Sequence, residues 1–100
     1  MAYVKRGFLE IISVMLSTMS GGPLRKTHIT FKCNLDSRAV GKYLRILNEH
    51  HLVRRSKENV SFYEITSRGR DYVTKYSQLL DILGSDETKI YSNLELSLKS

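Results

Sequence analysis

The hydrophobic pattern of this sequence changes its period after Leu52, and no other feature constrains the fold as strongly. Before Leu52, apolar residues recur every three to four positions, the spacing of helices that bury one face. Between residues 53 and 66 the chain is rich in β-branched and aromatic residues, which favour strands. A chain of 100 residues has room for a single domain, so these helices and strands must share one small core.

A polar stripe crosses the first apolar segment and predicts an amphipathic helix that ends in the turn 20–23. The stripe has the spacing of one helix face: Arg6, Glu10, Ser13, Ser17 and Ser20. The opposite face is expected in the core: Phe8, Leu9, Ile11, Ile12, Met15, Leu16 and Met19. A secretion signal would not carry the charged Glu10 in its apolar centre. No apolar run reaches the roughly 18–20 residues that span a bilayer.

Two more helices are predicted before the period changes. The first covers residues 24–33, and Asn34 can end it because asparagine tolerates a positive φ. The second starts at Asp36 or Ser37, either of which can cap a helix. Its core face repeats at three-to-four spacing: Val40, Tyr43, Leu44 and Leu47. Another face carries the cations Arg38, Lys42 and Arg45.

After the period changes, the runs 53–56 and 60–66 predict a two-stranded hairpin with a charged tip at residues 57–59. A fourth helix starts at Ser67 and stops at Gly84. Its apolar stripe steps by four, three and four: Tyr72, Tyr76, Leu79 and Leu83.

This order of elements predicts a mainly α fold with a small β-hairpin, of the α+β class. Three helices, a hairpin wing and a C-terminal helix are the layout of a winged helix-turn-helix. We assign residues 1–84 to this domain, with the C-terminal helix at 67–83. Residues 85–100 form a short tail, helical or partly disordered, with apolar residues at a spacing of four: Ile90, Leu94 and Leu98.

The charge is unevenly distributed and indicates a polyanionic partner. Sixteen Lys and Arg oppose ten Asp and Glu, a net charge of +6. Residues 1–56 hold ten of these bases and three of the acids, whereas residues 71–100 hold three bases and five acids. The first half is therefore expected to bind the anion, and the last thirty residues to serve another purpose.

Helix 36–50 has the dimensions to enter the major groove of B-DNA, where side chains read base edges. Hairpin 52–66 would then lie as a wing on the phosphate backbone or minor groove. Ser37 and Gly41 allow close approach, and the start of the second helix can meet a phosphate. The predicted DNA-binding residues are Lys26, Thr27, His28, Ser37, Arg38, Gly41, Lys42, Arg45, Arg55 and Lys57. Adjacent strand residues point to opposite faces, so Arg54 and Arg55 cannot make the same contact.

Catalytic and metal-binding chemistry is not indicated. The sequence has no Gly-rich phosphate loop and no acidic pair beside a nucleophile, so neither an enzyme nor a cofactor is predicted. No zinc-ligand spacing occurs among His28, Cys33, His50 and His51. The single cysteine cannot form an intramolecular disulfide, which favours a reducing cytoplasm, and is expected to pack as a small apolar residue.

Four segments of the chain, in order, carry a resemblance to a known family. They are Arg6-Gly-Phe-Leu-Glu-Ile-Ile12, Lys26-Thr27-His-Ile29 leading to Asn34-Leu35, Lys42-Tyr43-Leu44-Arg-Ile-Leu47, and Tyr63-Glu-Ile-Thr66-Ser-Arg-Gly69. At these residues the sequence resembles the small archaeal winged-helix DNA-binding proteins related to the ten-kilodalton Sulfolobus chromatin-associated protein. The resemblance covers about residues 5–83.

The resemblance implies a homodimer that binds duplex DNA, with an antiparallel coiled coil between the last helices. The interface residues would be Tyr72, Tyr76, Leu79 and Leu83. Two features depart from the family: Asp36 stands where serine is usual and adds a negative charge near the groove face, and the last helix is shorter, because it stops at Gly84.

The residues leave two classes of function open. One is a DNA-binding protein of the cytoplasm, associated with the chromosome as a transcriptional regulator or an architectural protein. The alternative is a winged-helix adaptor for protein–protein interaction that does not bind DNA. The cations of the third helix favour DNA, because an adaptor would more often expose an apolar patch there. Neither a membrane nor a small-molecule substrate is predicted as a partner.

Overall fold

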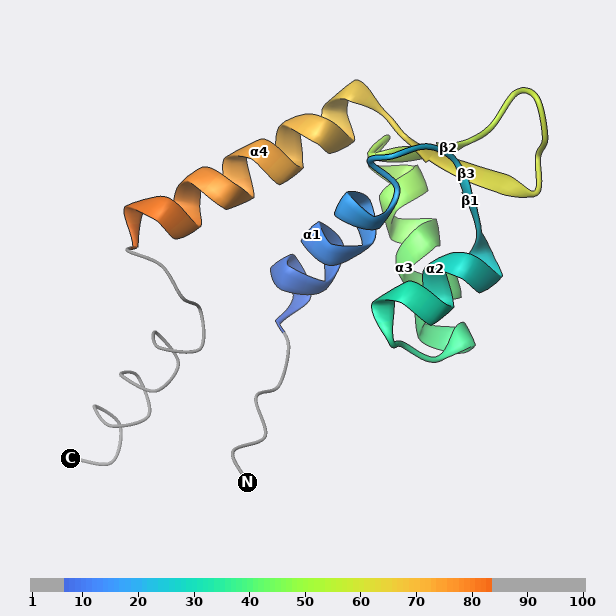
Figure 1. Ribbon diagram of the computed structural model, residues 1–100, viewed down its shortest axis with the longest axis horizontal. Coiled ribbons are helices and arrows are strands. Elements are labelled where there is room, and N and C mark those ends of the chain that lie inside the picture. The colour runs from blue at the N-terminus through green and yellow to red at the C-terminus, as the bar shows by residue number, and fades with distance from the viewer. Residues whose placement is uncertain (1–6, 84–100) are drawn as a thin grey trace.

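The computed structural model describes residues 7–83, which form four helices and a three-stranded antiparallel sheet (Figure 1). The elements are α1 (Phe8–Thr18), β1 (Leu24–Arg25), α2 (Lys26–Cys33), α3 (Ser37–Glu49), β2 (Val53–Arg55), β3 (Phe62–Ile65) and α4 (Ser67–Ile82). The expected α+β class and the order of helices and hairpin are confirmed. Arg6, the helix stop at Gly84 and the tail 85–100 lie outside the described residues.

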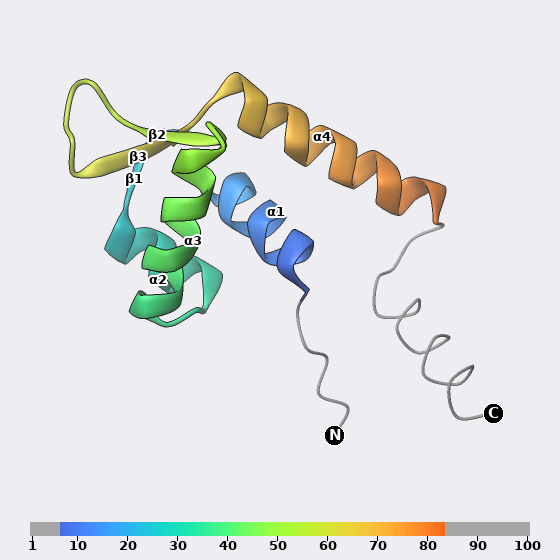
Figure 2. The same cartoon turned by 180° about the vertical axis from the view of Figure 1, so that it is seen from behind.

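The core is built around α1, which lies between α3 and α4 in both views (Figures 1 and 2). The buried apolar side chains come from the first three helices and the hairpin strands: Ile11, Ile12, Met15, Leu16, Met19, Ile29, Cys33, Val40, Leu44, Leu47, Val53 and Ile65. Cys33 packs there as a small apolar residue, as expected. The helical spacing of the sequence therefore identified most of this core correctly.

The prediction of which α1 residues face the core is wrong at three positions. Ser13 is buried although its spacing placed it on the polar stripe, because α1 packs against both α2 and α4 and so buries a wider arc. Phe8 and Leu9 are half-exposed although they were expected in the core. They belong to the first turn of α1, at the end of the helix, where fewer neighbours cover the side chains.

The sheet contains a strand that the sequence pattern did not predict. Residues 24–25 were expected to begin the second helix, yet they form β1 and pair with β3, Leu24 opposite Tyr63. The strand order is β1-β3-β2, so the predicted hairpin is two-thirds of a three-stranded sheet. Strand β3 also starts later than expected, at Phe62, because Asn59 accepts hydrogen bonds from the amides of Ser61 and Phe62 and holds the chain in a turn.

Local hydrogen bonds set the ends of the helices. Asn34 ends α2 with φ of 54° in the left-handed region, as its residue type predicted. Asp36 is the cap of α3, since its carboxylate accepts a hydrogen bond of 2.8 Å from the amide of Ala39. Thr66 caps α4, and its hydroxyl accepts a hydrogen bond of 3.0 Å from the amide of Gly69.

The start of α4 is attached closely to the end of α3. The amide of Thr66 donates to the carbonyl oxygen of Leu52 over 3.1 Å, and its hydroxyl donates to the carbonyl oxygen of His51 over 2.6 Å. A Cβ atom at Gly69 would overlap the Leu52 carbonyl oxygen, so only glycine fits this approach. Gly69 is the one buried residue of α4, and further along the helix Tyr72 and Val73 are partly buried against the core. The last turns of α4 are more exposed.

Candidate functional site

Helix α3 turns a charged face to solvent. Arg38, Lys42 and Arg45 are all exposed, and none of them forms an ion pair with another residue of 7–83. The opposite face holds the helix on the core through Val40, Leu44 and Leu47, which are buried. Three unpaired cations therefore stand on a firmly anchored helix, available to an external anion.

The start of α2 adds a further cation beside α3. The Lys26 ammonium lies against the helix at Gly41, and a Cβ atom there would be 3.1 Å from its Nζ. The glycine thus provides the close approach that its position in the sequence suggested, but to a lysine of the same chain. Thr27 and His28 are exposed on the first turn of α2.

The wing presents only one of its two adjacent arginines. Arg54 donates to the Glu64 carboxylate over 2.7 Å across the β2–β3 pair, which neutralises it. Arg55 points to the other face, where its guanidinium lies 4.8 Å from the centre of the Tyr63 ring. It also donates to the carbonyl oxygen of Val60 over 2.8 Å. Lys57 is exposed in the loop between the strands.

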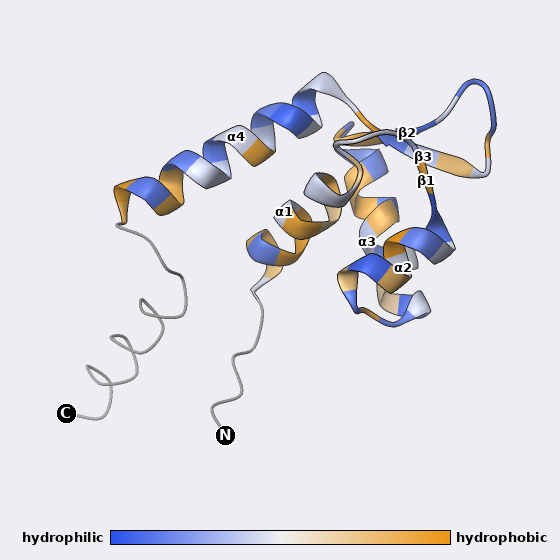
Figure 3. Cartoon of the chain, in the orientation of Figure 1, coloured by the Kyte–Doolittle hydropathy of each residue, from blue (hydrophilic) through white to orange (hydrophobic). Residues whose placement is uncertain are grey.

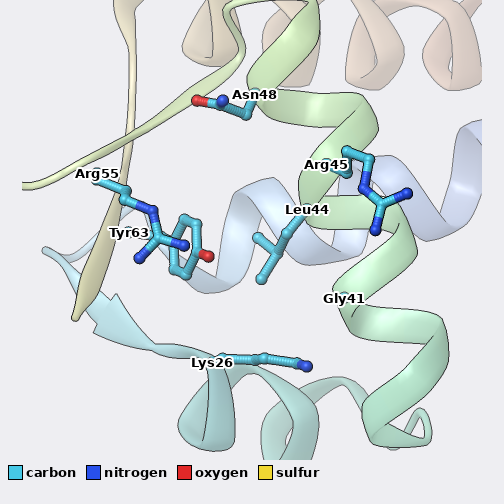
Figure 4. A pocket seen from close by; sticks show the side chains of 7 residues that line it. All are labelled: Lys26, Gly41, Leu44, Arg45, Asn48, Arg55 and Tyr63. Atoms are coloured by element: carbon cyan, nitrogen blue, oxygen red, sulfur yellow. The ribbon is translucent and has the colours of Figure 1, made fainter. Parts of the chain in front are cut away.

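These elements enclose a notch between α2, α3 and the wing, with a volume of about 340 Å³ (Figure 4). It is lined by Lys26, Gly41, Leu44, Arg45, Asn48, Arg55 and Tyr63. In Figure 4 the side chains of Lys26, Asn48 and Arg55 lie around Leu44, whereas the Arg45 guanidinium points away from the notch, along the outer side of α3.

The structure thus brings together part of the predicted DNA-binding set. Lys26, Gly41, Arg45 and Arg55 meet at the notch, whereas the other six predicted residues do not line it. Asn48 and Tyr63 were missed. Asn48 follows Gly41 and Arg45 at steps of four and three, so the helical spacing contained a signal for it. Tyr63 lies opposite Arg55 only because of the strand register, which the sequence pattern does not specify.

Two aromatic residues near this surface already have partners within the protein. The Tyr43 ring packs on the Phe8 ring with centres 5.9 Å apart. The Phe62 ring lies under the Arg25 guanidinium at 5.1 Å. Both rings are half-buried and already have a contact within the protein.

The predicted dimer residues form an uneven surface along α4. Tyr72 and Tyr76 stack with ring centres 6.3 Å apart, and the Tyr72 hydroxyl donates to the Leu9 carbonyl oxygen over 2.8 Å. Burial raises the pKa of Tyr72. Leu79 and Leu83 are 46% and 55% exposed, and Ile82, which was not predicted, is 81% exposed. In Figure 3 the far end of α4 is coloured largely as hydrophobic.

Residues 7–83 contain no cluster of three or more His, Cys, Asp or Glu side chains able to hold a metal ion. Among the helices of that range, none has the length and apolar character needed to cross a membrane.

A family model described as winged helix-turn-helix matches residues 5–84. The chain belongs to this family. The uncharacterized protein MJ0287 of Methanocaldococcus jannaschii is 30% identical over 81 residues, which are 81% of this chain and 80% of that protein. This archaeal relative agrees with the resemblance that the sequence motifs indicated.

Two solved structures are similar to this winged helix-turn-helix chain. Sso10a-2, a DNA-binding protein from Sulfolobus solfataricus, has a TM-score of 0.70 and 23% identity, over 94% of this chain and 95% of that one. NMB1585, a MarR family regulator from Neisseria meningitidis, has a TM-score of 0.53 and 16% identity, over 94% of this chain and 75% of that one. At these identities both comparisons support the fold.

Proposed function

We propose that this winged helix-turn-helix protein binds duplex DNA, with α3 in the major groove and the β2–β3 hairpin as the wing. The exposed face of α3 carries the proposal, because Arg38, Lys42 and Arg45 have no ion-pair partner among residues 7–83. An α-helix fits the major groove, and arginine and lysine contact both guanine edges and phosphates. The Sulfolobus protein of similar fold is itself described as DNA-binding.

The remaining predicted residues have supporting roles in this proposal. Ser37 places a small side chain on the groove face of α3, and Gly41 leaves room for the Lys26 ammonium beside it. Lys57 extends the wing toward the DNA backbone. Thr27 and His28 stand at the start of α2, whose first turn has no side-chain cap. The uncapped amides of a helix N-terminus favour an anion, so this turn would meet a phosphate.

The test is fluorescence anisotropy of a labelled random duplex of about 25 base pairs, titrated at several salt concentrations. If about five phosphates are neutralised, log affinity should fall against log salt with a slope of roughly −4 to −5. Replacing Arg38, Lys42 and Arg45 with alanine should weaken binding about 100-fold, at about 1 kcal/mol for each lost contact.

The matched control removes three cations from other surfaces: Lys32, Arg70 and Lys75. It has the same net charge as the α3 variant and should retain most of the affinity. Thermal melting of both variants checks that they fold. Equal losses in the two folded variants would refute the assignment of α3 as the DNA-binding helix.

A regulator and an architectural protein differ in how they respond to sequence. A site-specific regulator loses about 1–3 kcal/mol of binding free energy for each mismatched base pair, whereas an architectural protein binds all duplexes similarly. Selection of preferred duplexes from a random pool, followed by mismatch titrations, distinguishes the two roles. Either role would associate the protein with the chromosome.

We also propose a homodimer through α4. Leu79, Ile82 and Leu83 form an apolar end that nothing in residues 7–83 covers, and Leu9 and Tyr76 extend it toward α1 around a shallow hollow of about 200 Å³. Clustered exposed apolar side chains often mark an interaction site, and a second α4 in antiparallel orientation would bury these.

Sedimentation equilibrium tests this assembly. The wild-type chain should be a dimer, and the double variant Leu79→Ser, Leu83→Ser should be a monomer. Phe31→Ser is the control, since Phe31 is 85% exposed on α2, away from this surface. A wild-type monomer at all concentrations, or a dimer that survives the double substitution, would contradict the proposal.

A further inference from the structure

The notch between α2, α3 and the wing combines two cations that are far apart in the sequence. Lys26 comes from α2 and Arg55 from β2, and neither forms an ion pair with a residue of 7–83. Two neutral donors line the same space, the Asn48 amide from α3 and the Tyr63 hydroxyl from β3. No carboxylate lines the notch, so its chemistry is that of an anion site.

The Arg55 side chain is held in place before any ligand arrives. Its guanidinium lies over the Tyr63 ring, and Nη1 donates to the Val60 carbonyl oxygen. A guanidinium fixed in this way retains further N–H groups, in the planar arrangement that matches two oxygens of a phosphate. Holding the side chain beforehand reduces the entropy lost on binding.

The Lys26 ammonium reaches the notch because of the residue opposite it. Any side chain larger than hydrogen at position 41 would press on Nζ, which is 3.1 Å from the site of a Cβ atom there. In Figure 4, Lys26 crosses below Leu44 toward α3, while Arg55 lies over Tyr63 on the other side of the same space. The two positive charges thus bound one concave space from separate elements.

We propose that the notch binds a single phosphate group, held jointly by Lys26 and Arg55 with Asn48 and Tyr63 as neutral donors. Where the phosphate belongs to DNA, the inference rests on the proposed function. The notch adjoins the cation face of α3, so a duplex bound to that face would bring its backbone beside the wing. A free phosphorylated molecule offers the same chemistry, so the experiment separates the two sources.

The DNA arm uses the salt dependence of duplex binding, because each neutralised phosphate contributes about one to the slope of log affinity against log salt. Lys26→Gln and Arg55→Gln should each weaken binding about tenfold, as expected for a lost charged hydrogen bond. The loss of duplex affinity in the double variant should be smaller than the product of the two single-variant losses. The salt slope should be reduced by about one. Two separate phosphates would give multiplicative losses and a slope reduced by about two, which would overturn the proposal.

Two sets of variants serve as controls. Arg54→Gln removes the neighbouring charge, which is already paired with Glu64, and should change affinity by less than about threefold. Tyr63→Phe keeps the ring under Arg55 but removes the hydroxyl, so it should weaken binding by a few-fold and leave the salt slope unchanged. If Arg55→Gln behaves like Arg54→Gln while the wild type binds DNA, the notch does not hold a DNA phosphate, and the proposed function stands.

The second arm titrates the wild-type protein with inorganic phosphate, at constant ionic strength against sodium chloride, followed by amide NMR. Shifts at Asn48 and Tyr63 that disappear in the Lys26→Gln, Arg55→Gln variant would show that the notch accepts free phosphate, even if the wild type failed to bind DNA. Effects in the DNA arm alone would assign the site to the duplex backbone. No effect in either arm would overturn the inference.

Discussion

The two long helices, α3 and α4, bury their apolar faces to very different extents. In α3 the core residues Val40, Leu44 and Leu47 are at most 2% exposed. In α4 the one buried residue is Gly69, and the apolar side chains of the last turns remain open to solvent, Ile82 at 81%. Both helices begin with a side-chain cap, so the contrast does not arise from how they start.

The contrast separates two ways in which a helix serves a function. Helix α3 has its apolar surface satisfied within the protomer, so its outward face is free to carry unpaired cations toward a ligand. Helix α4 leaves apolar surface uncovered, and burying such surface stabilises an assembly by about 25 cal/mol for each Å². Helix α3 is therefore suited to bind an anion, and helix α4 to pack against another apolar surface.

The largest expected effect comes from truncating a leucine in each helix. Leu47→Ala should lower the free energy of unfolding by about 2–5 kcal/mol, because it opens a cavity in the core. Leu79→Ala should lower it by less than about 1 kcal/mol in the monomer, because that side chain is already partly hydrated. Urea unfolding at low protein concentration measures both values. Equal losses would remove the contrast between the helices.

The junction between the helices gives the next largest effect. Gly69→Ala should destabilise the fold by about 1–3 kcal/mol, since the added methyl group overlaps the Leu52 carbonyl oxygen and presses on Ile65. Gly21→Ala is the matched control, because no atom lies within 4 Å of its added Cβ. Thermal melting compares the two. Similar stabilities would mean that α4 can shift away from α3 without cost.

A smaller effect is expected at the polar link between α4 and α1. Tyr72→Phe removes the hydrogen bond to the Leu9 carbonyl oxygen and should cost about 0.5–1.5 kcal/mol. Burial raises the folded-state pKa of Tyr72 above 10.0, so its contribution is fully present below pH 10.0 and is lost as pH rises through the folded-state pKa. Unfolding measured from pH 8 to pH 11 should therefore show a shallower alkaline loss in Tyr72→Phe. An unchanged alkaline profile would contradict this account.

The smallest change in stability is expected on the outward face of α3, at Gly41. Gly41→Ala should stabilise the helix by up to about 1 kcal/mol, since alanine has the higher helix propensity. The added methyl group should also displace the flexible end of Lys26 and weaken duplex binding by a few-fold. Chemical unfolding and anisotropy measure the two quantities on one variant. A gain in both stability and duplex affinity would show that Lys26 does not act from the notch.

The cation face of α3 could be predicted because helical spacing alone places Arg38, Lys42 and Arg45 together. Asn48 lies on the same spacing but was overlooked, since a neutral amide adds nothing to a charge pattern. Strand β1 could not be predicted, because two residues are too few to show alternation. Its identity depends on pairing with β3, a partner nearly forty residues away along the chain.

By itself, the sequence determined the four helices, the end of α2 at Asn34, the hairpin and the charged face of α3, because each follows from residue type and from the spacing of nearby residues along a backbone of regular geometry. Only the tertiary structure decided which wing arginine is paired, where Lys26 meets Gly41, and how much of α4 stays uncovered. These outcomes depend on strand register and on how the helices pack against each other. Contacts of that kind join residues distant in the chain, and no local pattern encodes them.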